Sequence, residues 1–187
     1  MGLDFPLSAI AAPLLSFVIA FFSIRWLIKS KTDWVLDHPN SRSLHSVPLP
    51  RIGGLGLLLG VITTWLFFSV AIPIAIWIGI VLLVVISFID DIENLPVWCR
   101  LLMHSIAAVV FSVVLVPDIY GWAIVLCVIV AVIWMSNLYN FMDGSDGLAG
   151  GMTVIGFGYY GLSAYLAEHY DFAVINFSVA AAALAFL

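Results

Sequence analysis

Long apolar runs, each closed by charge, proline or glycine, dominate the sequence. A helix needs about 20 consecutive apolar residues, within a range of roughly 17–25, to cross the hydrocarbon core of a bilayer. Runs of about this length occur at 5–28, 52–71, 73–89, 100–116, 119–142, 148–167 and 172–187. We therefore expect an all-α, polytopic bundle of about seven transmembrane helices, forming a single transmembrane domain over residues 1–187.

The composition excludes an ordinary soluble domain, because 64% of the residues are hydrophobic and only 9% are charged. The first run could be mistaken for a signal peptide. It is too long for one and no basic residue precedes it, so we interpret it as a membrane helix. The runs at 73–89 and 100–116 are short enough that a re-entrant or interfacial segment is the alternative there.

Basic residues indicate the orientation, because cytoplasmic loops of membrane proteins carry an excess of Lys and Arg. With the N-terminus outside, all six basic residues fall on the cytoplasmic side: Arg25, Lys29, Lys31, Arg42, Arg51 and Arg100. The opposite side receives Asp4, Asp118, Glu168 and Asp171. We therefore expect three polar segments, at 29–54, 90–98 and 137–147, to face the cytoplasm.

Asp90 and Asp91 close the third apolar run, and Glu93 follows two residues later. A carboxylate at membrane depth costs at least about 2.5 kcal/mol, so such a pair is expected at the water interface or beside a cation. A divalent metal would relieve the repulsion among the three carboxylates. The alternative is a solvated helix end that does no more than stop the span.

The segment "NLYNFMDGSDG" places four polar residues at three-residue intervals: Asn137, Asn140, Asp143 and Asp146. On a continuous helix each step turns about 300°, so these side chains would drift around the axis. A helix that ends near Asp143, followed by a turn that glycine permits, would let them converge. Amides beside carboxylates suit a polar ligand or a magnesium-bound diphosphate. The alternative is a turn whose Asn and Asp side chains cap helix ends.

The first polar segment contains Arg42, His45 and Arg51, interleaved with prolines. Guanidinium groups at a membrane surface attract phosphate and anionic headgroups, although the positive-inside rule alone also accounts for the charge. His45 could contact phosphate, hold the loop by hydrogen bonds or act as an acid or base, and the sequence does not separate these roles.

Two glycine pairs at four-residue spacing, Gly56 with Gly60 and Gly147 with Gly151, are typical of close helix packing. His104 lies inside the fourth run, shortly after Arg100. Its side chain is expected either to have its hydrogen-bonding groups satisfied by a neighbouring helix or to face a polar cleft.

Taken together, the segments "DHPNSRSLHSVPLPRIGGLG", "FIDDIENLPVWCRLLMH" and "NLYNFMDGSDGLAGG" resemble the polyprenyl-phosphate N-acetylhexosamine-1-phosphate transferases, a group of glycosyltransferase family 4 type. The resemblance runs over nearly the whole chain. The first segment is more similar to the bacterial branch that initiates O-antigen and related surface polysaccharides than to the muramoyl-pentapeptide branch.

This resemblance implies a reaction in which the phosphate of undecaprenyl phosphate attacks the β-phosphorus of a UDP-N-acetylhexosamine. The products are undecaprenyl-diphosphate-sugar and UMP, and Mg²⁺ is the implied cofactor. The implied location is the cytoplasmic face of the bacterial inner membrane, at the start of lipopolysaccharide or other cell-envelope polysaccharide synthesis. The two substrates and the bilayer are the expected partners; no nucleic acid is expected, and self-association is left open.

The resemblance also implies roles for individual residues. Asp90 is the candidate base, and Asp91 is the candidate that helps to hold the metal ion or the diphosphate. Asp143 is a further catalytic and metal-binding candidate, while Asn137, Asn140 and Asp146 contact nucleotide, phosphates or the metal network. Arg42, His45 and Arg51 are expected to serve the lipid phosphate or the loop structure.

Members of this family carry further spans, with a metal-binding aspartate and a basic or histidine-rich segment in later cytoplasmic loops. This sequence shows neither, so we expect it to be the N-terminal part of a longer transferase and inactive alone. The alternative function is a non-catalytic bundle, either a small transporter or a subunit completed by another chain. A transporter places its ionisable groups near the bilayer midplane, whereas here they cluster at one interface.

Overall fold

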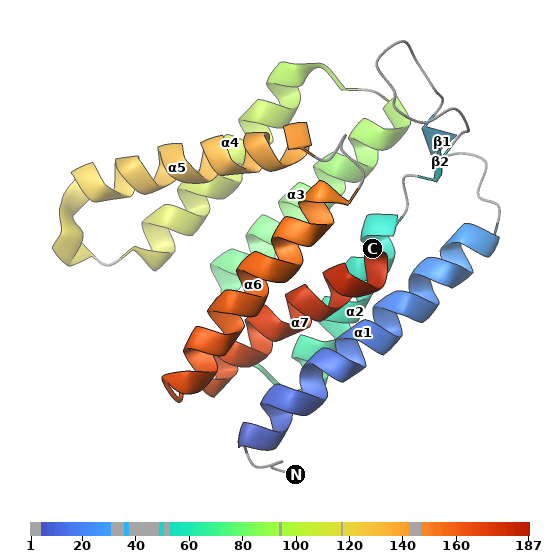
Figure 1. The fold of residues 1–187 in the computed structure, drawn as a ribbon. Helices are drawn as coiled ribbons and strands as arrows, with labels where there is room; N and C mark the ends of the chain where they lie inside the picture. The colour runs from blue at the N-terminus through green and yellow to red at the C-terminus, as the bar shows by residue number, and fades with distance from the viewer. Residues whose placement is uncertain are drawn as a thin grey trace. The chain divides into compact units, whose positions relative to one another are not determined.

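The structure is a computed structural model that describes residues 5–30, 36–37, 49–50, 53–93, 95–116, 118–142 and 147–187. Within these ranges it is almost entirely helical (Figure 1). The helices are α1 (Phe5–Lys29), α2 (Gly53–Phe67), α3 (Ile74–Glu93), α4 (Val97–Leu115), the 3-10 helix η1 (Asp118–Tyr120), α5 (Gly121–Met142), α6 (Leu148–Leu166) and α7 (Tyr170–Phe186). The predicted all-α bundle is confirmed, with one helix for each apolar run.

Between α1 and α2, the described residues add a two-residue antiparallel ladder that the sequence did not suggest. β1 (Leu36–Asp37) pairs with β2 (Leu49–Pro50), so that Leu36 lies opposite Pro50 and Asp37 opposite Leu49.

Helix α3 ends later than expected, and helix α4 begins earlier than expected. Helix α3 continues to Glu93, so Asp90 and Asp91 lie in its last turn rather than after it. Pro96 is the N-cap residue of α4, with an extended backbone. Because the residue before a proline disfavours the helical conformation, the "LP" step separates the two helices. Arg100 consequently lies in the first turn of α4.

The chain divides into two compact units, which are described separately: unit 1 comprises Met1–Ala71 and Asp143–Leu187, and unit 2 comprises Ile72–Met142. The expectation of a single transmembrane domain stays a prediction.

In unit 1, α7 packs against α1, α2 and α6, and α1 also packs against α2. Small residues such as Ala12 and Ser16 on α1 and Ala182 on α7 are fully buried. The Ser16 hydroxyl donates a 2.8 Å hydrogen bond to the backbone carbonyl of Ser178 on α7. Small side chains let helix backbones approach closely, which favours association where lipid surrounds the helices.

The pair Gly56 and Gly60 lies directly against α1, as predicted. A β-carbon on Gly56 would lie 2.5 Å from Cγ1 of Ile24, and one on Gly60 would lie 2.7 Å from the backbone oxygen of Ser16. The matching expectation for Gly151 is wrong, because a β-carbon there would meet nothing within 4 Å. The packed glycine on α6 is Gly150, whose β-carbon would lie 2.7 Å from Leu187.

These contacts bring four helix ends together. Gly53, which begins α2, lies against Phe186 at the end of α7, and Gly150 in the first turn of α6 lies against Leu187. Ile24, near the end of α1, lies against Gly56. The end of α1, the starts of α2 and α6 and the end of α7 therefore share one end of unit 1, which we call end A.

Unit 2 is an up-and-down arrangement in which α4 packs against both α3 and α5 (Figure 1). Short connections, at 94–96 and 116–120, join these helices. The last turn of α3, the first turn of α4 and the last turn of α5 therefore lie toward the same end of unit 2, which we call end B.

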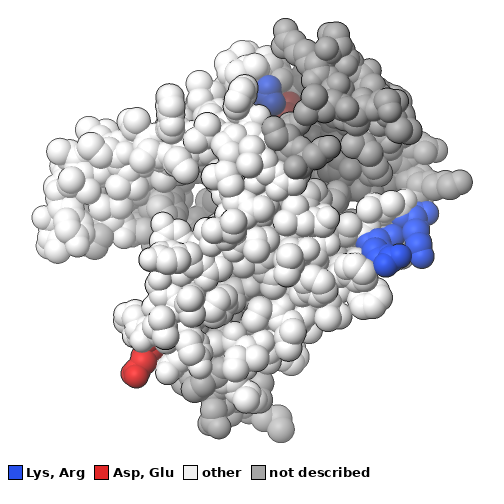
Figure 2. Space-filling view, in the orientation of Figure 1, with Lys and Arg blue, Asp and Glu red and all other residues white. Residues whose placement is uncertain are grey.

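Within the described ranges, three helical stretches are long and apolar enough to cross a membrane: Leu7–Lys29, Val97–Leu115 and Gly121–Met142. Shorter apolar helices cover Gly53–Phe67, Ile74–Asp90 and Tyr170–Phe186. Large apolar side chains such as Phe22, Trp26 and Trp134 are exposed, and most of the described surface visible in Figure 2 carries no charge. Such an apolar exterior suits contact with lipid, and the chain is a membrane protein.

The α1–α2 contact generates a stability prediction for Gly60→Ala. Its methyl group would press on backbone atoms of α1 that cannot rotate away, so the free energy of unfolding should fall by about 1–3 kcal/mol. Gly54→Ala is the matched control on the same helix, because nothing lies within 4 Å of its β-carbon position. Thermal melting in detergent measures both variants, and equal melting temperatures would contradict the packing described.

Candidate functional site

Asp90 and Arg100 form an ion pair that joins α3 to α4 at end B. Arg100 Nη1 donates to Asp90 Oδ2 at 3.2 Å. The side chains retain 34% exposure for Arg100 and 21% for Asp90, so both charges are partly withdrawn from water. A carboxylate with a guanidinium partner, placed at the ends of apolar helices, is chemically suited to meet a charged ligand.

Arg100 is a site residue that the sequence analysis used only to orient the chain. Its connection to Asp90 could have been found from the spacing of the two residues. The "LP" step ends the helical run, and the connection from α3 to α4 is short, so the last turn of α3 and the first turn of α4 are expected to lie near each other.

Arg100 and His104 are one turn apart on α4, and each has a buried nitrogen without a hydrogen-bond partner among the described residues. These atoms are Arg100 Nε and His104 Nδ1. One of the two expectations for His104 was a hydrogen bond to a neighbouring helix. Among the described residues, Nδ1 of His104 makes no such bond. Buried polar atoms are usually paired, so this face of α4 retains unused capacity to bind polar groups.

Asn137 and Asn140 lie near the end of α5, also toward end B, and both are exposed. The side-chain nitrogen of Asn137 donates a 2.8 Å hydrogen bond to the carbonyl of Ile133, one turn earlier. Helix α5 runs to Met142, and the four residues after it lie outside the described part of the chain, so the helix end expected near Asp143 stays a prediction. Gly147 has the left-handed backbone, with φ of 72°, that glycine readily adopts.

The side chains of six predicted site residues lie outside the described part of the chain: Arg42, His45, Arg51, Asp91, Asp143 and Asp146. The backbone of Asp91 belongs to α3. Of the described residues next to the segments that carry the other five, Gly53 and Gly147 lie at end A, whereas Met142, which precedes Asp143, is the last residue of α5 at end B. The roles of these six residues stay predictions.

Among described residues, no group of three or more His, Cys, Asp or Glu side chains could hold a metal ion. The two residues predicted to bind Mg²⁺, Asp91 and Asp143, are not among those whose side chains are described. The magnesium prediction therefore stays a prediction, supported by the preference of this ion for carboxylate oxygens.

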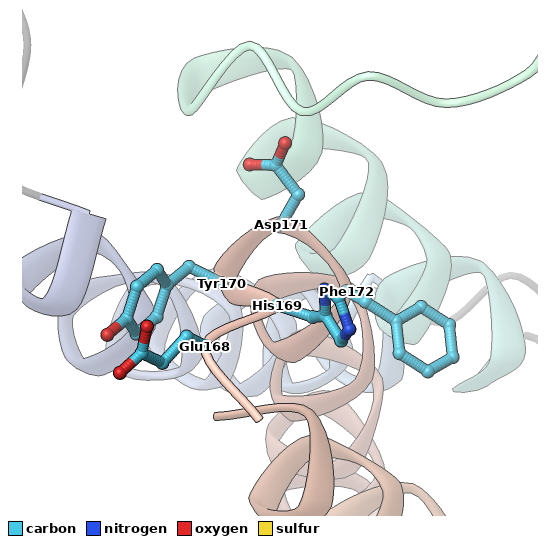
Figure 3. Close-up of a pocket in the computed structure, with 5 residues that line it drawn as sticks. All are labelled: Glu168, His169, Tyr170, Asp171 and Phe172. Atoms are coloured by element: carbon cyan, nitrogen blue, oxygen red, sulfur yellow. The ribbon is translucent and has the colours of Figure 1, made fainter. Parts of the chain in front are cut away.

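An open hollow of about 560 Å³ lies at the turn between α6 and α7, away from end A. Glu168, His169, Tyr170, Asp171 and Phe172 line it. In Figure 3, Glu168 and His169 extend to opposite sides and Asp171 points away from both. The hollow therefore does not gather its polar groups around one point, and we do not assign it to the site.

The fold defines an integral membrane protein, and its candidate site lies at the charged ends of apolar helices. The model of glycosyl transferase family 4 matches residues 73–187, which include α3, α4 and α5. This match covers more than half of the sequence, and the chain belongs to that family.

Curated relatives extend the similarity toward the N-terminus. A probable undecaprenyl-phosphate N-acetylglucosaminyl 1-phosphate transferase of Bacillus subtilis is 28% identical over 136 residues, covering 65% of this chain and 38% of the relative. An undecaprenyl-phosphate alpha-N-acetylglucosaminyl 1-phosphate transferase of Yersinia pestis is 25% identical over 189 residues, covering 91% of this chain and 51% of the relative.

A phospho-N-acetylmuramoyl-pentapeptide-transferase of Halalkalibacterium halodurans is 29% identical over 167 residues, covering 74% of this chain and 51% of the relative. The chain thus spans about half, or less, of the length of these relatives. No solved structure matches the chain.

The exposure of the α5 asparagines predicts that they contribute little to stability. Asn137→Ala and Asn140→Ala should leave the melting temperature unchanged or slightly raised, because alanine is the better helix former. Asn176→Ala on α7 is the buried counterpart. The Asn176 side chain is 3% exposed, and its nitrogen donates a hydrogen bond to the carbonyl of Phe172. Loss of this side chain should therefore lower the melting temperature. Equal destabilisation of all three variants would show that the α5 asparagines are structural.

Proposed function

We propose that the protein containing this chain transfers an N-acetylhexosamine-1-phosphate from a UDP-sugar to undecaprenyl phosphate and releases UMP. The observation that carries the proposal is the Asp90–Arg100 pair, a charged site at end B, inside the region that the family model matches. Two of the relatives above are named for transfer of N-acetylglucosaminyl 1-phosphate to this lipid, so UDP-N-acetylglucosamine is the first donor to test.

The order of the helices supports a site on one side of the membrane. If each of the seven helices crosses the bilayer, the ends of α1, α3, α5 and α7 face the same side, whatever the arrangement of the two units. End A and end B would then both meet the cytosol, as the positions of the basic residues predict. A lipid acceptor in the bilayer and a nucleotide sugar in the cytosol can meet only at this interface.

In the proposed reaction, an oxygen of the lipid phosphate forms a bond to the β-phosphorus of the UDP-sugar. The bond from that phosphorus to the bridging oxygen breaks, and UMP leaves with the oxygen. Asp90 accepts the proton of the lipid phosphate if that group is protonated. Asn137 and Asn140, exposed at the same end of unit 2, offer amide groups to the nucleotide or its phosphates.

Asp91 and Asp143 are the proposed ligands of Mg²⁺, because carboxylate oxygens are the side-chain ligands this ion prefers. When bound, the ion neutralises charge on the phosphates, which is the main requirement of phosphoryl transfer. Arg42, His45 and Arg51 are proposed to serve the lipid phosphate.

A transporter function is less well supported by the described charges. The charged side chains that the structure describes lie close to helix ends or in a turn. Those within about one turn of a helix end are Arg25, Lys29, Asp90, Glu93, Arg100 and Asp171, and Glu168 lies in a turn. A transport pathway would place ionisable groups near the middle of the membrane.

The proposed biosynthetic role of the transfer reaction is in bacterial cell-envelope or lipopolysaccharide synthesis at the inner membrane.

The test is a transfer assay on the full product of the reading frame that contains residues 1–187. Purified protein is given undecaprenyl phosphate, UDP-N-acetylglucosamine labelled in the sugar, and Mg²⁺. We expect release of UMP in step with the appearance of label in the lipid. Absence of both products with every UDP-N-acetylhexosamine tried would contradict the proposal.

Asp90→Asn should lower kcat by 10²-fold or more, since positioned acid–base groups typically contribute about 10²–10⁴. The matched control is Asp171→Asn, the same change at an exposed position on α7 outside the site. It should retain the wild-type rate. Unaltered turnover in Asp90→Asn would remove Asp90 from the mechanism.

A further inference from the structure

We propose that Arg100 is a positioning residue, which holds the Asp90 carboxylate in the orientation that the transfer reaction requires. The inference rests on the proposed function and adds Arg100 to the residues that serve that reaction. Its basis is the ion pair between the last turn of α3 and the first turn of α4.

The contact leaves one side of the carboxylate available. Arg100 Nη1 bonds Oδ2 of Asp90, and Oδ1 has no partner among the described residues. A carboxylate held by one oxygen has a restricted side-chain rotation, while its other oxygen is left available to the reacting group. Holding a reacting group near its productive geometry removes much of the entropic cost of the reaction.

The guanidinium is itself well placed to hold Asp90. Only about a third of the Arg100 side chain is exposed, its Nε is buried, and its Nη1 reaches Oδ2. Among the described residues, Asp90 is its ion-pair partner, and Arg100 Nε makes no hydrogen bond. Nothing described therefore competes with Asp90 for this arginine.

The pair is poorly suited to a purely structural role. It consists of one hydrogen bond of 3.2 Å between partly exposed side chains, and ion pairs of this kind contribute little to stability. The connection at 94–96 already holds the two helices together covalently. Loss of Arg100 should therefore change the reaction much more than the melting temperature.

The test compares Arg100→Gln and Arg100→Lys in the transfer assay, with melting temperatures measured in parallel. For Arg100→Gln we expect kcat to fall by about 10²-fold, the loss that a displacement of about 1 Å can cause, while KM for both substrates changes less than about twofold. Lysine retains the charge and a donor but lacks the planar fork, so Arg100→Lys should recover part of the lost rate.

Arg25→Gln is the matched control. Arg25 lies near the end of α1 with its guanidinium 5.2 Å from the centroid of the Phe21 ring, and it is also expected on the cytoplasmic side. The Arg25→Gln substitution removes the same positive charge but leaves the Asp90–Arg100 pair intact, so kcat should remain at the wild-type value.

Three results would overturn the inference. An unchanged kcat in Arg100→Gln would show that Asp90 needs no support from Arg100. A raised KM with kcat retained would assign Arg100 to direct substrate contact. A melting temperature well below that of Arg25→Gln, or failure to fold, would assign it to joining α3 and α4. Absence of activity in the wild-type protein would instead contradict the proposed function.

Discussion

The high free energy of an unpaired charge inside a bilayer is the constraint on which this architecture depends. It confines the described charges to helix ends and turns, and it leaves the helix faces to apolar and small residues. Chemistry that needs carboxylates, guanidinium groups and a polar substrate must then take place at an interface. End B meets this requirement, with Asp90 and Arg100 on neighbouring turns and the two asparagines of α5 toward the same end.

Packing within unit 1 follows from the same environment. Because lipid is as apolar as leucine, large apolar side chains gain little by leaving it, and close backbone approach becomes the main source of helix association. Gly56, Gly60 and Ser16 provide this approach between α1 and α2, and the Ser16–Ser178 bond joins α1 to α7. The contacts fix which helix ends meet at end A: the end of α1, the starts of α2 and α6, and the end of α7.

The sequence predicted all seven helices, because an apolar run long enough to span a bilayer has few alternatives to a helix. It was less successful where a few residues decide the outcome. The extension of α3 past Asp90 depends on where backbone helicity stops, and Gly150 rather than Gly151 packs because a one-residue step turns a helix position by about 100°. Arg100 was not recognised as a partner of Asp90, although the short connection between α3 and α4 is the signal that would have pointed to this pair.

The most direct test of the account is the sidedness of ends A and B. In a variant without Cys99 and Cys127, single cysteines would replace Ser30 and Glu93 at these ends and Tyr120 and Glu168 at the opposite helix ends. A membrane-impermeant maleimide applied to sealed spheroplasts should label positions 120 and 168 at once and positions 30 and 93 only after permeabilisation. Labelling of 30 and 93 from opposite sides would contradict the proposal that both ends meet the cytosol.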